Sequence, residues 1–297
     1  MNEAKTIWMN GELVKWHDAK IHVLTHTLHY GMGVFEGIRF YKTSQGAAVF
    51  RLREHIERMM KGAKTCFMEI PFTEDQLVQA VIDTIKSNEL DEGYIRPIVY
   101  YGYGKMGLDP KGAPTDIAIA VWPWGSYLGE DAVKVKTSSF FRIHPGSTHA
   151  DAKICGHYVN SIFASVEAKH NGFDEALLLD YEGYVAEGPG ENIFIVKNNE
   201  ITTPCLTNVL PGITRKSVIS IAEDEKIQCH EKKLTIEDVY NADELFFTGT
   251  AAEIAPIASV DDKSFKLPGQ VTMRFKEIFS GIVHGKNKKY EDWLTYC

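Results

Sequence analysis

The sequence lacks three features that would place it in particular classes of protein. It has only five cysteines, widely spaced and without a C-x-x-C pair, which argues against a disulfide framework or a structural zinc site. No stretch approaches the run of about 20 apolar residues that spans a membrane. The first residues show neither the basic nor the apolar region of a secretory signal. A reduced, cytoplasmic setting is therefore expected.

The sequence also has fewer positively charged residues than negatively charged ones. Lysine and arginine number 32 against 40 aspartates and glutamates, which gives a formal net charge of −8 at pH 7. An acidic chain repels polyphosphates, so nucleic acid is not an expected partner. The remaining composition is ordinary for a globular protein, with 44% hydrophobic and 24% charged residues. The length of 297 residues exceeds a typical single core and predicts two domains.

The first part of the chain reads as strands followed by amphipathic helices. The Asn-Gly pair at 10–11 lies between two short extended runs, which predicts a β-hairpin. Residues 51–64 carry apolar side chains at helical spacing. The Thr-x-x-Gln motif at 73–76 is a capping box and predicts the start of a second helix.

The second part is a series of short strands interrupted by helices. Helices are predicted at about 157–170, 212–225, 235–241 and 269–284. Strand clusters with helices around them indicate the α/β (α+β) class with a barrel-like layer arrangement. A turn-rich stretch between the two parts predicts domains of 1–122 and 135–297, connected by residues 123–134.

Two motifs resemble binding sites but lack the context that those sites need. Residues 102–107, GYGKMG, match the glycine pattern of dinucleotide-binding proteins, but two prolines follow where a helix should begin, so a loop is expected. His22, His26 and His29 have the spacing of a zinc-binding helical face. Their segment favours an extended or irregular chain and has no H-E-x-x-H glutamate, so we expect packing histidines and no metal site.

Three local features carry possible chemistry. Lys153 stands among small and apolar neighbours, where desolvation favours a nucleophilic amine, although a surface lysine before a helix shows the same pattern. Glu187 ends a strand before a Gly-Pro-Gly turn, as a solvent-facing hairpin acid also would. The GTAA turn at 249–252 and the helix start after Gly212 can offer backbone N–H groups to an anion.

These features and the phenol of Tyr158 together describe a pyridoxal-phosphate site. The chain also resembles the fold-type IV pyridoxal-phosphate enzymes, and within them the branched-chain-amino-acid aminotransferases. The resemblance covers almost the full length, through the motifs FRLREHIERM, GYIRPIVYYG, EGPGENIFIV, LPGITR and GTAAEIAPI. It implies a small N-terminal α/β domain and a larger barrel-like C-terminal domain that carries the lysine.

The resemblance implies which residues hold the cofactor, pyridoxal 5′-phosphate. Lys153 is the implied catalytic residue and forms the Schiff base, Glu187 pairs with the ring nitrogen, and Tyr158 contacts the ring oxygen. The phosphate is implied to lie among Arg58, Ile213, Thr214 and Thr250. Family members usually have asparagine where this chain has His157, a difference that leaves these assignments in place.

The resemblance also implies how substrates are bound. The walls of the side-chain pocket are implied to be Tyr30, Phe35, Trp124 and Tyr127. The α-carboxylate is implied to meet Tyr94 and the backbone of Thr250 and Ala251, and the γ-carboxylate of glutamate is implied to meet Arg96. A loop of a second subunit is implied to supply Met106 and Leu108, so a homodimer or an assembly of dimers is expected.

The implied reaction is transamination between branched-chain L-amino acids (Leu, Ile and Val) and 2-oxoglutarate, which gives branched-chain 2-oxo acids and L-glutamate. Three activities of the same fold remain as alternatives, because they share Lys153: a D-amino-acid aminotransferase, an amine transaminase and an aminodeoxychorismate lyase. The motifs YIRP, VFEGIR and GTAAEIAP favour the branched-chain type.

Overall fold

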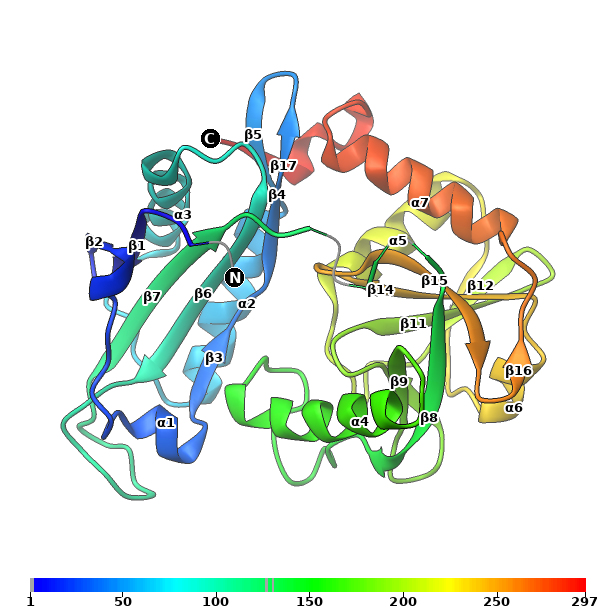
Figure 1. Cartoon of the computed structure of the whole chain (residues 1–297), viewed down its shortest axis with the longest axis horizontal. Helices are drawn as coiled ribbons and strands as arrows, with labels where there is room; N and C mark the ends of the chain where they lie inside the picture. Colours follow the sequence, from blue (N-terminus) through cyan, green and yellow to red (C-terminus); the bar gives the residue numbers. More distant parts are fainter. Residues whose placement is uncertain (1–2, 126–127, 130) are drawn as a thin grey trace. The chain divides into compact units, whose positions relative to one another are not determined.

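The computed structural model describes residues 3–125, 128–129 and 131–297, and the chain divides into two compact units (Figure 1). Unit 1 comprises Met1–Gly125, Ala152–His157 and Gly281–Cys297. Unit 2 comprises Ser126–Asp151 and Tyr158–Ser280. Each unit is built on its own β-sheet, so each is described by itself.

Unit 1 contains an antiparallel sheet of eight strands. Its order is β17-β5-β4-β6-β7-β1-β2, and β3 pairs with β6 off this path. The strands are β1 (Thr6–Met9), β2 (Glu12–Lys15), β3 (Gly33–Phe35), β4 (Ile38–Thr43), β5 (Gly46–Phe50), β6 (Gly93–Tyr101), β7 (Thr115–Trp122) and β17 (Leu294–Tyr296). The helices are α1 (His26–Tyr30), α2 (Leu52–Thr65) and α3 (Glu74–Asn88), with short 3-10 turns η1 (Trp16–Asp18), η2 (Cys155–His157) and η3 (Lys288–Trp293).

Helices α2 and α3 pack against each other, and α3 also contacts β7 and β1 (Figure 1). The apolar spacing predicted for α2 is confirmed, because Leu52, Ile56, Met59 and Ala63 are all buried in one core. Burial of a large apolar side chain contributes about 1.5–3 kcal/mol, so this face fixes the helix on the sheet.

The local signals for the hairpin and the capping box are also confirmed. Asn10 and Gly11 both have positive φ, 50° and 106°, as the turn between β1 and β2 requires. Thr73 accepts a hydrogen bond from the Gln76 backbone N–H at 3.3 Å, and Gln76 Oε1 accepts one from the Thr73 backbone N–H at 2.8 Å. The first turn of α3 thus has side-chain partners for its backbone donors.

The expectation of an extended or irregular chain through the three histidines is wrong at residues 26–30, which form α1. Gly31 closes this helix in the left-handed conformation, and its N–H bonds to the Thr27 carbonyl oxygen at 2.8 Å. His26 is buried and its Nε2 contacts the Gly107 carbonyl oxygen at 2.8 Å, so a contact 81 residues away stabilises the turn. Among the described residues, no group of three or more His, Cys, Asp or Glu side chains could hold a metal ion.

The segment that carries Lys153 belongs by its contacts to unit 1, whereas the sequence assigned it to the C-terminal domain. Ile154 forms a β-bridge with Val34 of β3. The Gly156 backbone N–H also donates to the Gly31 carbonyl oxygen at 3.0 Å. A Cβ on Gly31 would lie 2.9 Å from the Gly156 Cα, so the two backbones approach closely. Contacts of this kind have no signature in local sequence.

Unit 2 contains a mixed sheet of nine strands. Its order is β10-β9-β8-β15-β14-β11-β12-β13, with β16 paired to β15. The strands are β8 (Val133–Phe141), β9 (Glu175–Leu179), β10 (Val185–Glu187), β11 (Asn192–Lys197), β12 (Glu200–Thr203), β13 (Cys229–Glu231), β14 (Glu244–Gly249), β15 (Glu253–Val260) and β16 (Lys263–Ser264). The remaining helices are α4 (Tyr158–His170), α5 (Ile213–Asp224), α6 (Ile236–Tyr240) and α7 (Gln270–Val283), which confirms the four helices predicted there.

The core of unit 2 is apolar and partly aromatic. Phe194 of β11 stacks on Phe246 of β14 with ring centroids 5.1 Å apart. Helix α4 packs on β8 and β9, and α5 packs on β14. In the described part of the chain, no helix has the length and apolar character that crossing a membrane requires.

Candidate active site

Lys153 is fixed to the end of β3 through its backbone. Its carbonyl oxygen accepts a hydrogen bond of 3.1 Å from the Phe35 backbone N–H. Its neighbours Ala152 and Ile154 are buried, so the small and apolar setting expected from the sequence is present. The side chain is half-buried, and Nζ lies 5.0 Å from the centroid of the Phe35 ring. The amine is therefore held beside an aromatic wall of unit 1.

Tyr94 and Arg96 lie on one face of β6, as their spacing of two residues predicts. Arg96 Nη2 donates to the Tyr94 hydroxyl at 3.4 Å, and the Arg96 guanidinium lies 4.8 Å from the Phe35 ring centroid. Trp124 packs edge-on against Tyr94 with ring centroids 4.4 Å apart. The structure thus places Arg96 and Lys153 beside the Phe35 ring, with Tyr94 bonded to Arg96 and Trp124 packed on Tyr94.

Two details of this cluster indicate a site for acidic groups. A Cβ on Gly37 would lie 1.9 Å from the Tyr94 hydroxyl oxygen, so only glycine leaves room for this hydroxyl. Arg96 Nε is buried and has no hydrogen-bond partner among the described residues. A buried donor without a partner is unfavourable unless a ligand pairs with it, and a guanidinium pairs best with a carboxylate.

Glu36, which is fully buried, holds the guanidinium of Arg58. Arg58 Nε donates to Glu36 Oε1 at 2.6 Å and Nη2 donates to Oε2 at 2.8 Å, while His55 Nδ1 contacts Oε2 at 2.8 Å. Burial acts to raise the pKa of Glu36, but the charge of Arg58 and the contact with His55 hold it well below its usual range. The same burial lowers the pKa of His55. Arg58 is thus fixed on α2 by a bidentate ion pair.

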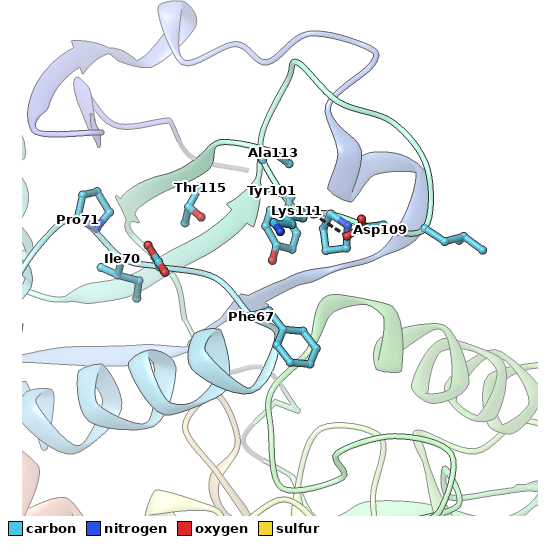
Figure 2. A pocket seen from close by; sticks show the side chains of 12 residues that line it. Phe67, Ile70, Pro71, Tyr101, Asp109, Lys111, Ala113 and Thr115 are labelled. Atoms are coloured by element: carbon cyan, nitrogen blue, oxygen red, sulfur yellow. Dashed lines mark hydrogen bonds between the residues drawn. The ribbon is translucent and has the colours of Figure 1, made fainter.

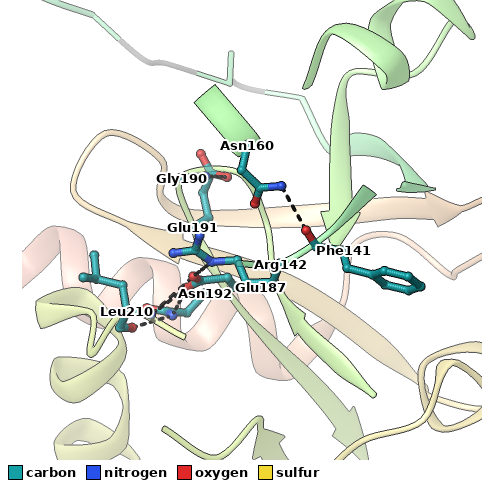
Figure 3. Close-up of polar contacts among 8 residues, drawn as sticks. All are labelled: Phe141, Arg142, Asn160, Glu187, Gly190, Glu191, Asn192 and Leu210. Carbon is teal, nitrogen blue, oxygen red and sulfur yellow. Dashed lines mark hydrogen bonds and ion pairs between the residues drawn. The ribbon is translucent and has the colours of Figure 1, made fainter. Parts of the chain in front are cut away.

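In unit 2, the carboxylate of Glu187 is surrounded by hydrogen-bond donors (Figure 3). Arg142 Nε donates to Oε1 at 2.6 Å, and Asn192 Nδ2 donates to Oε2 at 3.0 Å. The Leu210 backbone N–H is shared between the two oxygens at 3.3 and 3.1 Å. Glu187 is only 4% exposed, so the alternative of a solvent-facing hairpin acid is wrong.

The helix start expected to bind an anion is packed against the same network. Helix α5 begins at Ile213, and its N-cap is Gly212, which has no side chain to bond the first N–H groups. Asn192 Nδ2 also donates to the Leu210 carbonyl oxygen at 2.9 Å. A Cβ on Gly212 would lie 2.0 Å from Asn192 Oδ1. The backbone donors at Ile213 and Thr214 are therefore placed by Asn192 in a position suited to a phosphate.

The second turn that was expected to bind an anion lies beside the turn that follows Glu187. Thr250 and Ala251 form the turn between β14 and β15. A Cβ on Gly249 would lie 3.4 Å from the Gly190 carbonyl oxygen, so the two turns approach closely. The pairing of β11 with β14 places both turns at the same end of adjacent strands. Tyr158 begins α4 in this unit.

Three of the expected substrate residues have their contacts elsewhere in unit 1. Tyr30 on α1 is exposed and lies against His26, with ring centroids 4.6 Å apart. Met106 and Leu108 are exposed in the loop between β6 and β7, and Leu108 is 90% exposed. Tyr127 lies outside the described residues. The contacts shown for Tyr30, Met106 and Leu108 therefore do not connect them to the cluster at Phe35.

Leu108 lines an open pocket of about 1060 Å³ between the β6–β7 loop and the segment that connects α2 to α3 (Figure 2). Phe67, Ile70 and Tyr101 supply its apolar side, and Asp109 bonds the Lys111 backbone N–H at 3.0 Å. Among the described residues that line it, Leu108 is the single expected site residue. This pocket is thus separate from the groups that carry chemistry.

Sequence reasoning did not single out Glu36, His55, Arg142 or Asn192. Glu36 and Asn192 lie within the quoted motifs VFEGIR and EGPGENIFIV, so a search for partners of the expected residues could have found them. Arg142 had no such signal, because it follows an ordinary strand and meets Glu187 from 45 residues away.

A model of the family described as amino-transferase class IV matches residues 33–260. The chain therefore belongs to the class IV amino-transferase family. It is 47% identical to the branched-chain-amino-acid aminotransferase of Pseudomonas aeruginosa over 295 residues, which cover 97% of this chain and 96% of that protein.

Solved structures give the same picture of the fold. The branched-chain aminotransferase of Thermoproteus uzoniensis with norvaline has a TM-score of 0.96 and 44% identity, covering 98% of this chain and 99% of that one. The branched-chain amino acid aminotransferase of Thermobaculum terrenum in its PLP-form has a TM-score of 0.94 and 34% identity, covering 99% of each chain. These likenesses confirm the two-domain fold-type IV architecture and the class of enzyme expected from the sequence.

Proposed function

We propose that the protein transfers amino groups between branched-chain L-amino acids (leucine, isoleucine and valine) and 2-oxoglutarate. The observation that carries this proposal is the cluster at Phe35, where Lys153 and Arg96 lie beside the ring and Arg96, whose Nε is buried, bonds the Tyr94 hydroxyl. It combines an amine with an aromatic wall and a donor for a second carboxylate. The relatives named branched-chain-amino-acid aminotransferase add support, whereas the D-amino-acid, amine and lyase alternatives gain none from them.

The cofactor we propose is pyridoxal 5′-phosphate, and the residues present fit it. The Thermobaculum terrenum enzyme was solved in its PLP-form, the holo-form. In this chain the buried carboxylate of Glu187 fits a protonated ring nitrogen, and the start of α5 at Gly212 fits a phosphate. When bound, the group supplies a ring that takes up the negative charge developing at the substrate Cα.

Each cofactor residue then has a role that its environment explains. Lys153 Nζ would hold the aldehyde and, once the substrate amine has displaced it, would accept the proton that leaves the substrate Cα. Glu187 would accept a hydrogen bond from the ring nitrogen, and Tyr158 would donate one to the ring oxygen. Arg58 is held in one plane by Glu36, which suits it to a phosphate. The phosphate site is completed by Ile213, Thr214 and Thr250.

The substrate is bound by two polar groups and an apolar wall. Tyr94, with the backbone of Thr250 and Ala251, binds the α-carboxylate that every substrate has. Arg96 pairs with the γ-carboxylate of glutamate. Its Nε has no hydrogen-bond partner among the described residues, which supports this role. The aliphatic side chains of the branched substrates would lie against Tyr30, Phe35, Trp124 and Tyr127, and Met106 and Leu108 would come from the loop of a second subunit.

The direct test is an assay of the purified protein supplied with pyridoxal 5′-phosphate, L-leucine and 2-oxoglutarate. We expect L-glutamate and the 2-oxo acid of leucine to form in equal amounts. D-leucine in place of L-leucine is the matched control and should give no product. If product formed from D-leucine and not from L-leucine, the result would contradict the proposal and favour the D-amino-acid alternative.

We also propose that the protein is a homodimer or an assembly of dimers in the cytoplasm. Val159, Ile162 and Phe163 form an exposed apolar face on α4, and such a face favours association with a second copy of the chain. All five cysteines are described and none forms a disulfide, which fits a reducing compartment. Light scattering should give at least twice the chain mass, and Ile162→Glu should reduce it. A wild-type mass of one chain would contradict self-association.

A further inference from the structure

Arg142 gives the carboxylate of Glu187 a fixed positive partner (Figure 3). Its Nε donates to Glu187 Oε1 at 2.6 Å, and its backbone N–H donates to the Leu179 carbonyl oxygen at 2.7 Å. Arg142 is 9% exposed and Glu187 is 4% exposed. Solvent and salt therefore screen this ion pair only weakly. The pair is a permanent part of unit 2 and does not depend on a mobile surface side chain.

Arg142 differs in kind from the two other donors drawn at this carboxylate. Asn192 Nδ2 and the Leu210 backbone N–H are neutral, and together they already hold both carboxylate oxygens. The orientation of Glu187 therefore does not depend on Arg142 alone. Of these three donors, Arg142 is the one that adds a formal charge. Its Nη1 is buried and has no hydrogen-bond partner among the described residues.

We propose that Arg142 is a positioning residue that keeps the proton on the ring nitrogen of the bound cofactor and off Glu187. The inference rests on the proposed function. A proton shared by the ring nitrogen and Glu187 can lie on either atom. Its transfer to Glu187 breaks the N–H bond, forms an O–H bond and neutralises the carboxylate. Arg142 would then be a buried cation without an anion, which is strongly unfavourable.

Arg142 thereby maintains the electron-withdrawing state of the ring that transamination needs. Its loss should move the proton toward Glu187. Hydrogen bonds to charged groups are stronger than those to neutral groups. The difference is large enough to shift the equilibrium of the proton between the ring nitrogen and Glu187 roughly ten- to hundredfold. A purely structural role would change stability or cofactor affinity but would leave the proton on the ring nitrogen.

The experiment uses the holoprotein with pyridoxal 5′-phosphate labelled with ¹⁵N in the ring, because the ¹⁵N chemical shift reports whether that nitrogen carries a proton. Two variants separate charge from hydrogen bonding: Arg142→Gln keeps a neutral donor, and Arg142→Lys keeps the charge. We expect a protonated nitrogen in the wild type and in Arg142→Lys, and a shift toward the unprotonated form in Arg142→Gln. Arg51→Gln, which also removes a buried arginine paired with a glutamate, should keep the wild-type signal.

A protonated nitrogen in Arg142→Gln would overturn the inference, as would an unprotonated one in the wild type. If Arg142→Gln does not retain the cofactor, Arg142→Lys decides, since an unprotonated nitrogen there would show that charge is not what Arg142 supplies. A wild-type protein that neither binds the labelled cofactor nor forms glutamate would overturn the proposed function itself. That result is distinct, because it appears before any variant is compared.

Discussion

Among the individual residues, the ring of Phe35 connects two groups with different tasks. Lys153 Nζ and the Arg96 guanidinium lie 5.0 and 4.8 Å from its centroid. Both groups therefore lie within the distance at which a cation and an aromatic ring attract each other. In the proposed function, Arg96 would bind only substrates with a second carboxylate, whereas Tyr94 would bind the α-carboxylate of every substrate. The same cluster would then accept aliphatic and acidic side chains in turn.

We expect Arg96→Leu to separate the two kinds of substrate. Loss of a charged donor costs about 1.5–3 kcal/mol, so kcat/KM for glutamate and 2-oxoglutarate should fall roughly ten- to hundredfold. Leucine and isoleucine should be largely spared, because their side chains need no cation. Each half-reaction can be followed by the absorption spectrum of the cofactor. Equal losses for glutamate and leucine would mean that Arg96 is structural.

We expect Lys153→Ala to abolish turnover and the covalent attachment of the cofactor. Borohydride should no longer fix the cofactor to the chain, which mass spectrometry of the intact protein detects. Lys136→Ala is a matched control, because Lys136 also lies near an aromatic ring, 5.9 Å from the centroid of Phe173. The control should keep both properties. Persistent attachment in Lys153→Ala would assign the role to another amine.

Among the elements, the connection from β11 to α5 links two expected cofactor contacts. Asn192 at the start of β11 bonds Glu187 and the Leu210 carbonyl oxygen. Leu210 in turn donates its backbone N–H to Glu187, three residues before α5 begins. The carboxylate and the helix start are therefore held by the same side chain. A change at one should displace the other.

We expect Gly212→Ala to weaken cofactor binding, because its Cβ would lie 2.0 Å from Asn192 Oδ1. Overpacking of this kind costs about 1–3 kcal/mol, so the affinity should fall about tenfold or more. Gly281→Ala in α7 meets open space and should instead raise stability by about 0.4–1 kcal/mol. Fluorescence titration of the apoprotein and thermal unfolding measure the two effects. Unchanged affinity in Gly212→Ala would contradict the link.

For the whole molecule, the buried group Glu36, His55 and Arg58 makes stability depend on pH. Burial tends to raise the pKa of Glu36, but Arg58 and His55 hold that pKa below its ordinary value of 4.5. The stability that the ionised carboxylate contributes is therefore present above pH 4.5 and is lost as the pH falls below that value. Burial places the pKa of His55 below 6.5, so protonation of His55 at lower pH also favours the unfolded chain. Both groups therefore make acid destabilising.

We expect Glu36→Gln to lower the free energy of unfolding at pH 7 by roughly 3–5 kcal/mol, because it removes the anion from a buried, bidentate ion pair. The difference from the wild type should shrink as the pH falls from about 5 to about 3, where the wild-type carboxylate begins to lose its contribution. Asp91→Asn removes an exposed ion pair with Lys42 and should have no measurable effect. Denaturant titrations at several pH values test this, and a difference that does not depend on pH would contradict it.

Local signals predicted the elements well and the site partly. Asn10-Gly11 and Thr73-x-x-Gln76 specify a turn and a helix start from a few adjacent residues, so the hairpin and α3 were predicted correctly. In the three-histidine segment, the chain at residues 26–30 was predicted wrongly, because His26 is held by a backbone oxygen far along the chain. The assignments of Lys153, Arg58 and Glu187 to a cofactor stay predictions. Glu36, the partner of Arg58, and Arg142, the partner of Glu187, were identified only from the structure.

The sequence by itself determined the secondary structure, the class of fold and the kinds of group available for chemistry, because periodicity, capping and turn residues act over a few positions. Only the tertiary structure decided which charged side chains form buried ion pairs. The Glu36–Arg58 and Glu187–Arg142 pairs join residues 22 and 45 positions apart. The tertiary structure also decided that Lys153 lies on unit 1, since its strand partner Phe35 is remote in sequence. Burial and long-range pairing depend on how the helices and strands pack, and local sequence patterns do not predict this packing.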